Sequence, residues 1–227
     1  MKNYNIAIDG PAGAGKSTIA KSIAQKLQYI YVDTGAMYRA MALYMIRNGI
    51  DTAEEEAVSK ACSRIDITIE YIDGEQQVKL NGENATAFIR DEEVGKNASV
   101  VARYHAVREK MVELQQSLAS SSNVIMDGRD IGTVVLPNAD LKIYLTASSK
   151  TRALRRWKEL EDKGISSKIE DIETDIIKRD RQDMNREISP LRQAEDAVLV
   201  DSSDLTIEEV IDKIILLFKE KYNGDML

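Results

Sequence analysis

The sequence predicts an α/β fold in which a mainly parallel sheet of five strands is covered by helices on both faces. Short apolar runs alternate with helical patterns along the chain, and each run is followed by polar or glycine residues, as in buried parallel strands. The predicted strands span residues 5–9, 29–33, 123–127, 141–146 and 197–201. Because ligands of such sheets bind outside the carboxyl ends of the strands, we expect the functional site there.

The composition excludes several classes of protein. The chain has 227 residues, enough for one α/β domain with insertions, and its net charge of −7 argues against general nucleic-acid binding. Cys62 is the only cysteine and His105 the only histidine, which argues against disulfides, structural zinc and Ser-His-Asp chemistry. The apolar runs are too short for a signal peptide or a membrane span. We therefore expect a cytoplasmic protein, without a membrane partner and monomeric.

The first predicted strand leads into a glycine-rich loop. Gly10-Pro11-Ala12-Gly13-Ala14-Gly15-Lys16-Ser17 matches the P-loop pattern, and apolar residues at helical spacing follow it. Glycines let backbone N–H groups close around phosphate oxygens, and the helix dipole favours negative charge. Lys16 is expected to reach the β- and γ-phosphates of a nucleotide, and the Ser17 hydroxyl to face Mg²⁺. The alternative, a chance glycine turn, does not explain the flanking strand and helix.

The middle of the chain departs from the alternating pattern. Between residues 66 and 86 apolar side chains recur at every second position, and Asp73-Gly74 is a hairpin turn signal, which together predict a small antiparallel sheet inserted into the fold. Thr52-x-x-Glu55 and Thr206-x-x-Glu209 are capping-box patterns that mark helix starts. The last helix is predicted to run from Ile207 to about Tyr222.

Seven of the chain's 14 arginines fall between residues 150 and 192. This segment is predicted to form two charged helices, joined by a flexible link over residues 164–167, with the form of a hinged flap. A solvated helix surface is the alternative, but guanidinium groups beside a P-loop suit the clamping of polyphosphate. Each predicted helix carries three charged side chains whose spacing places them on one shared face. They are Arg152, Arg155 and Arg156 on the first helix, and Arg179, Asp183 and Arg186 on the second.

A P-loop alone predicts nucleotide binding and not a reaction. The DxxG and NKxD strings that a GTPase switch needs occur nowhere in the sequence. A small-molecule kinase needs an acceptor pocket, cations around the transferred phosphoryl group and a cover against water. Arg39 follows the second predicted strand, Arg129 follows the third, and Arg186 lies in the flap, so these side chains are the expected cations.

The chain resembles the bacterial cytidylate kinase family of P-loop nucleoside monophosphate kinases over nearly its whole length. The resemblance rests on residues 8–18, 33–39, 127–135 and 179–186, of which the second and third blocks are more specific than the P-loop. The predicted antiparallel insert is similar to the enlarged monophosphate-binding domain of that family. One departure is Thr34, which stands where many relatives have serine and keeps the hydroxyl.

The resemblance implies phosphorylation of CMP and dCMP by ATP with Mg²⁺, and a role for each matching position. Lys16, Arg39, Arg129 and Arg186 would act on the acceptor phosphate and the transferred phosphoryl group, and Ser17 would face the metal. The ATP contacts would be Gly10, Pro11, Ala12, Gly13, Ala14, Gly15, Lys16, Ser17, Thr18, Arg152, Arg155 and Arg156. The CMP contacts would be Thr34, Arg39, Ser99, Arg108, Arg129, Asp130, Arg179, Asp183 and Arg186.

The chemistry of cytosine agrees with one of these roles. Its N4 amino group is a donor, and a carboxylate such as Asp130 is a suitable acceptor. Uracil has an oxygen at that position, and an unpaired carboxylate would cost about 1–3 kcal/mol. Two assignments have ordinary alternatives, because Arg108 fits a surface charge on a helix and Asp183 fits an ion pair within one helix.

The resemblance also implies a division of the chain. Residues 1–38, 106–149 and 191–227 would form the core, residues 39–105 the monophosphate-binding domain, and residues 150–190 the lid. Two alternative functions stay open at this point. The chain could be a kinase for another monophosphate such as UMP or for a small non-nucleotide acceptor, or a nucleotide-dependent switch without acceptor chemistry.

Overall fold

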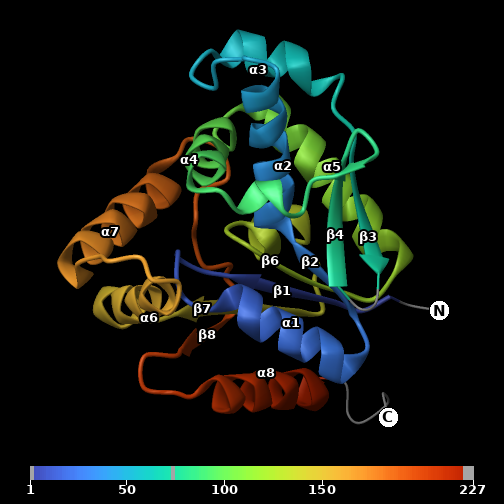
Figure 1. The fold of residues 1–227 in the computed structure, drawn as a ribbon. Helices are drawn as coiled ribbons and strands as arrows, with labels where there is room; N and C mark the ends of the chain where they lie inside the picture. Colours follow the sequence, from blue (N-terminus) through green and yellow to red (C-terminus); the bar gives the residue numbers. More distant parts are fainter. Residues whose placement is uncertain (1–2, 73–74, 222–227) are drawn as a thin grey trace. The chain divides into compact units, whose positions relative to one another are not determined.

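The computed structural model describes residues 3–72 and 75–221, which form an α/β fold with two sheets (Figure 1). The larger sheet has five strands in the order β2-β6-β1-β7-β8, and β1 pairs in parallel with both β6 and β7. The predicted fold class and all five predicted strands are confirmed, with ends that shift by at most one residue. The strands are β1 (Asn5–Asp9), β2 (Ile30–Asp33), β6 (Val124–Gly128), β7 (Leu141–Thr146) and β8 (Val198–Asp201).

The helices lie between the strands and after the last strand. None of those in the described part of the chain has the length and apolar character needed to cross a membrane. They are α1 (Lys16–Leu27), α2 (Thr34–Arg47), α3 (Glu55–Cys62), the 3₁₀-helix η1 (Phe88–Arg90), α4 (Glu92–Val101), α5 (His105–Ser121), the π-helix η2 (Ile131–Val135), α6 (Ser149–Asp162), α7 (Ile169–Asn185) and α8 (Ile207–Lys221). The two helices predicted for the charged segment are α6 and α7.

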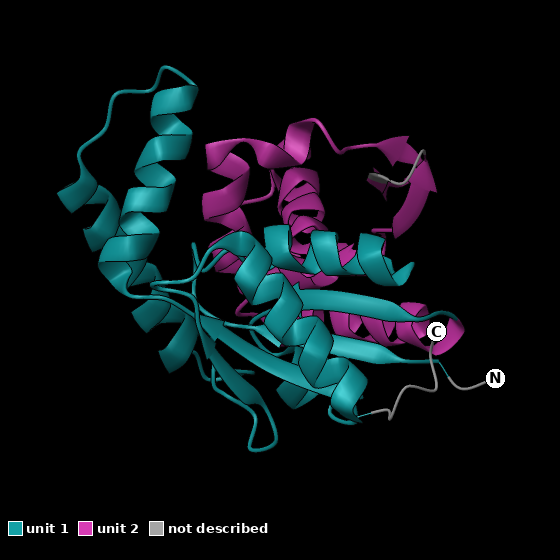
Figure 2. Ribbon diagram, turned by 90° about the horizontal axis from the view of Figure 1, so that it is seen from below, with its two compact units in different colours: residues 1–31, 122–227 teal, residues 32–121 magenta. Residues whose placement is uncertain are grey.

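The chain divides into two compact units (Figure 2). The first comprises the described residues of 1–31 and 122–227, and the second comprises residues 32–121. The second unit includes α2 and α5, because α2 packs against α4 and η1 while α5 packs against α2 and α3. The monophosphate-binding segment expected from the sequence, residues 39–105, lies inside this unit.

The core of the first unit lies between its sheet and two helices. Ile6 and Ile8 of β1 are fully buried, and Ile19 and Ile23 of α1 pack with them on the same face as Phe218 of α8. The apolar residues of α1 and α8 recur every three or four positions, so each helix presents one apolar stripe to the sheet. This packing holds the carboxyl end of β1, where the glycine-rich loop begins, against a rigid layer.

One of the two predicted capping boxes forms. At the start of α8 the Thr206 hydroxyl accepts the N–H of Glu209 at 3.3 Å, and the Glu209 carboxylate accepts the N–H of Thr206 at 2.8 Å. The prediction for Thr52 is wrong, since α3 begins after Glu54 and the Thr52 side chain hydrogen-bonds with Asn97 of α4. The predicted helix end near Tyr222 lies outside the described residues.

The second unit contains the predicted antiparallel sheet. Its strands are β3 (Ile67–Ile72), β4 (Glu75–Leu80) and β5 (Glu83–Asn84), with Ile69 opposite Val78. Ile67, Val78 and Leu80 are buried, as the two-residue period of this segment predicts. The Asp73-Gly74 turn signal lies outside the described residues.

Candidate active site

The glycine-rich loop joins β1 to α1, and its geometry requires glycine. Gly10 has φ 152°, and a Cβ atom there would lie 1.9 Å from the backbone oxygen of Leu145, so a side chain cannot fit. Gly15, with φ 85°, is the N-cap of α1, and the helix begins at Lys16. The N–H groups in the first turn of a helix have no partner within the helix, and the macrodipole adds positive potential. The loop is therefore suited to bind an anion such as a phosphate group.

Lys16 is buried at the bottom of this loop. Its Nζ atom donates a hydrogen bond to the backbone oxygen of Pro11 at 2.8 Å. Burial, followed by the nearby charge of Arg129, lowers the pKa of Lys16 to about 7, although Asp127 and Asp9 act in the opposite direction. An anion bound beside Lys16 would favour its charged form.

Ser17 and Asp127 form an oxygen-rich site next to Lys16. The Ser17 hydroxyl donates to one carboxylate oxygen of Asp127 at 2.9 Å, and the Tyr31 hydroxyl donates to the other at 2.9 Å. A hydroxyl and a carboxylate are ligands that suit Mg²⁺, which takes most of its remaining ligands from water and substrate phosphates. No cluster of three or more His, Cys, Asp or Glu side chains suited to a metal occurs among the described residues.

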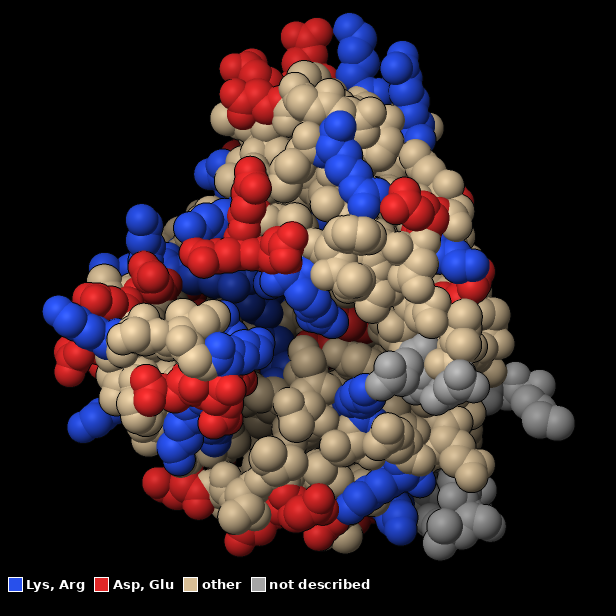
Figure 3. Space-filling model, viewed as in Figure 1, with Lys and Arg blue, Asp and Glu red and all other residues tan. Residues whose placement is uncertain are grey.

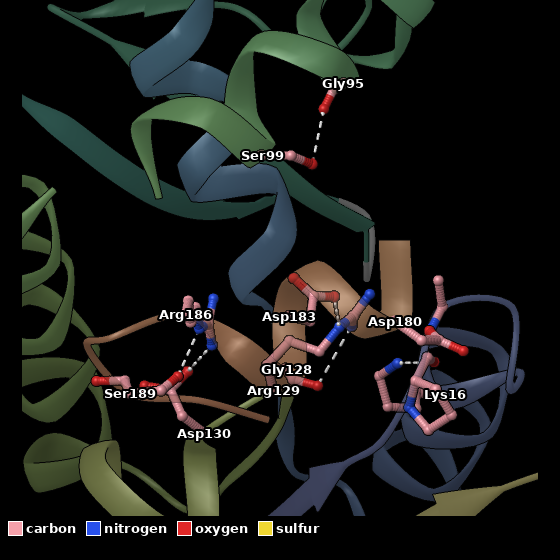
Figure 4. Close-up of polar contacts among 12 residues, drawn as sticks. Lys16, Gly95, Ser99, Gly128, Arg129, Asp130, Asp180, Asp183, Arg186 and Ser189 are labelled. Carbon is pink, nitrogen blue, oxygen red and sulfur yellow. Dashed lines mark hydrogen bonds and ion pairs between the residues drawn. The ribbon is translucent and has the colours of Figure 1, made fainter. Parts of the chain in front are cut away.

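Arg129 and Asp183 come from different segments and form a largely buried ion pair. Arg129 follows β6 and Asp183 lies on α7, and their Nε and Oδ2 atoms are 2.8 Å apart, as the facing side chains in Figure 4 show. Burial opposes both charges, but Asp183 raises the pKa of Arg129, and Arg129 in turn lowers that of Asp183. Asp183 therefore pairs with a cation outside its own helix, and the charge of Arg179 on α7 acts on it as well.

A second buried pair lies beside the first. Arg186 Nη2 is 3.7 Å from Asp130 Oδ1, and Arg186 Nε donates to the backbone oxygen of Ser189 (Figure 4). Helix α7 ends at Asn185, and Arg186 has an extended backbone. The prediction that Arg186 shares a helical face with Asp183 is thus wrong, since the side chain reaches Asp130 from beyond the helix end. The third member of that set, Arg179, is exposed on α7.

Arg152 contacts the glycine-rich loop directly. Its Nη1 atom donates to the backbone oxygen of Ala12 at 2.8 Å and to Asp180 of α7 at 2.6 Å. The other carboxylate oxygen of Asp180 accepts the N–H of Ala12 at 3.1 Å. Asp180 was absent from the residues expected at the site. The signal in the sequence is the apolar Ile176 four positions earlier, because residues four apart share one face of a helix, and both are buried on α7.

The two other arginines of α6 have different surroundings. Arg155 is half-buried and donates to the backbone oxygen of Ser202 at 2.6 Å, whereas Arg156 is exposed and pairs with Glu159 at 3.0 Å. Figure 3, drawn in the view of Figure 1, shows Lys and Arg side chains mixed with Asp and Glu side chains where α6 and α7 lie. The exposed surface of these helices is thus of mixed charge.

In the second unit, α2 carries two of the expected residues, Thr34 and Arg39. Thr34 is buried at the first position of the helix, and the N-cap residue Asp33 accepts the N–H of Ala36 at 2.9 Å. The Asp33 carboxylate also pairs with Arg90 at 3.0 Å. Arg39 lies further along α2, and its guanidinium donates to the backbone oxygen of Ile89 at 3.2 Å.

Two further expected residues lie on α4 and α5. The Ser99 hydroxyl donates to the backbone oxygen of Gly95 at 3.3 Å (Figure 4). Arg108 is only 3% exposed, and its guanidinium lies over the Tyr38 ring, 5.6 Å from the centroid. The alternative that Arg108 is an ordinary surface charge is therefore wrong. The Nη1 atom of Arg108 also donates to the backbone oxygen of Ala102 at 3.3 Å, so the guanidinium is held in a fixed position.

Comparison with known proteins identifies the family. The sequence model of the cytidylate kinase family matches residues 6–220. The chain belongs to the cytidylate kinase family. It is 52% identical over 218 residues to the cytidylate kinase of Caldicellulosiruptor bescii, with 96% of each chain covered. It is 46% identical over 220 residues to the cytidylate kinase of Bacillus subtilis, covering 97% of this chain and 98% of that one.

Solved structures support the fold at lower similarity. A gluconokinase from Sinorhizobium meliloti aligns over 98% of this chain and 97% of its own with a TM-score of 0.50, at 13% identity. This likeness concerns the fold alone. Membership of the cytidylate kinase family makes the chain a nucleoside monophosphate kinase, a phosphotransferase that takes phosphate from ATP and acts on small nucleotides.

Proposed function

We propose that the protein transfers the γ-phosphoryl group of ATP to CMP and dCMP, giving CDP and dCDP, with Mg²⁺ as the metal. The observation that carries this proposal is the presence of two buried arginine–carboxylate pairs in one unit with the P-loop, Arg129–Asp183 and Arg186–Asp130. Guanidinium groups suit the phosphate of the acceptor, and a buried carboxylate suits the amino group of its cytosine.

ATP would bind through its phosphates along residues 10–18. The backbone N–H groups of the loop and the Lys16 ammonium would hold the β- and γ-phosphates. Ser17 and Asp127 would hold Mg²⁺, which neutralises charge on the phosphate oxygens when bound. Support comes from the place of Lys16, which is buried with its Nζ atom 2.8 Å from the backbone oxygen of Pro11 in the loop, where a bound anion would favour its charged form.

Arg39, Arg129 and Arg186 would bind the acceptor phosphate and the transferred phosphoryl group. Charge spreads over the equatorial oxygens of that group in the transition state, and fixed cations stabilise it there. Before CMP binds, the carboxylates of Asp183 and Asp130 compensate Arg129 and Arg186. Residues 150–190 would form a lid that excludes water, with Arg155 and Arg156 turning to ATP on closure.

The base and sugar of CMP would be bound by the remaining residues that the family resemblance implies. Asp130 would accept a hydrogen bond from the cytosine amino group, and Arg179 and Asp183 would contact the sugar. Thr34, Ser99 and Arg108 would also take part in the recognition of cytosine. Support comes from the fixed position of the Arg108 guanidinium, which donates to the backbone oxygen of Ala102 at 3.3 Å and lies over the Tyr38 ring.

ADP release measured with CMP, dCMP, UMP, AMP and no acceptor tests the proposal. We expect turnover with CMP and dCMP that exceeds the rate with every other acceptor and without one. Fastest turnover with UMP or AMP would favour a kinase for another monophosphate. ATP hydrolysis that is independent of an acceptor would favour a switch. A monomeric state and a cytoplasmic location stay predictions from the sequence.

Asp130→Asn and Lys16→Ala separate the proposed roles. Because asparagine can offer an N–H to the uracil oxygen, Asp130→Asn is expected to shift the CMP/UMP ratio of kcat/KM toward UMP by roughly ten-fold or more. Lys16→Ala should abolish turnover while CMP binding stays nearly unchanged. An unchanged ratio in the first variant, or an equal loss of CMP binding in the second, would contradict the assignments.

A further inference from the structure

Asp9, the last residue of β1, holds a backbone turn through its carboxylate. The side chain is buried, with 4% exposed, and its two oxygens accept the N–H groups of Ile131 at 2.8 Å and Gly132 at 2.7 Å. These are the first residues of the π-helix η2, whose N-cap residue Asp130 makes no capping hydrogen bond with its own side chain. Asp9 therefore caps η2 from a neighbouring strand.

The backbone of Asp9 holds the residue before Arg129, at the other end of the segment that leads to η2. Asp9 pairs with Gly128 in the parallel ladder between β1 and β6. Only Arg129 and Asp130 lie between Gly128, held by the backbone of Asp9, and Ile131, held by its side chain. One residue of β1 thus closes a short loop that carries a cation and an anion proposed to contact CMP.

We propose that Asp9 is a positioning residue that holds Arg129 and Asp130 in the orientation that binds CMP. The inference rests on the proposed function and deepens it, because it assigns the orientation of these two groups to a residue that does not itself contact CMP. A buried ionised carboxylate is costly, so its placement at two N–H groups needs a compensating benefit. Burial raises the pKa of Asp9 to about 6 despite the hydrogen bonds from Gly132 and Ile131, which agrees with that cost.

Asparagine is the informative replacement. Two N–H donors need two acceptors, and a carboxylate offers one oxygen to each. Asp9→Asn keeps the size of the side chain but turns an N–H₂ group toward one of the two donors. One capping hydrogen bond is then lost, and the segment between Gly128 and Ile131 gains freedom.

Asp140 provides a matched control in the same unit. It is a buried carboxylate that accepts the N–H of Asn5 at 2.8 Å, at the opposite end of β1. Asp140→Asn changes the same chemical group, and it does so at a contact with the end of β1 that is opposite Asp9. Its effects report what the loss of a buried carboxylate does to stability alone.

Steady-state kinetics and thermal melts of the full chain test the inference. For Asp9→Asn we expect the KM for CMP to rise roughly ten-fold and the CMP/UMP ratio of kcat/KM to fall. The KM for ATP should rise clearly less, because Asp9 acts on Lys16 only as one of several nearby carboxylates. Asp140→Asn should lower Tm and leave both KM values unchanged. An unchanged KM for CMP in Asp9→Asn, or an equal rise for CMP and ATP, would overturn the inference.

Turnover of the wild-type protein shows whether a failed test refutes the role of Asp9 or the proposed function. A wild type without CMP-dependent turnover refutes the function, and the same KM comparison with whichever monophosphate it uses still tests Asp9. If Asp9→Asn does not fold, amide hydrogen exchange in the wild type decides. Slow exchange of the Ile131 and Gly132 amides supports the cap, and rapid exchange of both overturns it.

Discussion

Replacing Asp180 by asparagine is expected to destabilise the protein by about 3–5 kcal/mol. The carboxylate pairs with Arg152 at 2.6 Å, and the two side chains are only 10% and 7% exposed. Removing the negative charge leaves a buried guanidinium without a counter-charge, and the Ala12 N–H competes for the one remaining acceptor oxygen. The loop that Ala12 belongs to should loosen as well, so the KM for ATP should rise.

The exposed pair Arg156–Glu159 is the control for the loss of stability expected in Asp180→Asn. Its atoms are 3.0 Å apart, close to the separation in the buried pair, but its side chains are 50% and 61% exposed. Water compensates both charges there, so Glu159→Gln should change the free energy of unfolding by less than about 0.5 kcal/mol. We expect the two variants to differ because the first pair is desolvated and the second is not.

Denaturant unfolding at neutral pH measures both effects. The free energies of unfolding of wild type, Asp180→Asn and Glu159→Gln would be compared, together with the double variant Arg152→Met/Asp180→Leu. Because the double variant leaves no unpaired charge, it should recover most of the stability lost in Asp180→Asn. A loss below about 1 kcal/mol in Asp180→Asn, or one no larger than that of Glu159→Gln, would refute the reasoning.

Three further predictions concern single groups. Because burial and Arg129 lower the pKa of Lys16 to about 7, ATP binding at pH 8 should take up about one proton and binding at pH 6 much less. Calorimetry in buffers of different ionisation enthalpy measures this uptake, which should vanish in Lys16→Met. Because burial raises the pKa of Asp9 from 3.8 to about 6, its contribution to stability should fall by about 3 kcal/mol as the pH rises through that interval. Asp9→Asn lacks this slope, so parallel stability curves for it and wild type would contradict the assignment. Thr206→Ala should lower stability by about 1 kcal/mol in a thermal melt through loss of the α8 cap, and an unchanged Tm would count against the capping box.

The sequence predicted those features that depend on residues close together in the chain. The five strands, the antiparallel insert, α6, α7 and the capping box at Thr206 all follow from local periodicity or turn chemistry. The box at Thr52 failed because its side chain bonds with Asn97, which is 45 positions away. The shared face of Asp183 and Arg186 failed because α7 ends between them, at Asn185.

By itself, the sequence determined the α/β fold class, the glycine-rich loop and the family, because these rest on patterns of neighbouring residues. The tertiary structure alone decided which group each buried charge contacts. Arg129 pairs with Asp183, Arg152 pairs with Asp180, and the Asp9 carboxylate accepts the backbone N–H of Ile131. A buried charge must find a partner, but the partner is whichever group the strand ends and the helices bring within reach. That proximity arises from the packing of segments far apart in the chain, and local spacing carries no record of it.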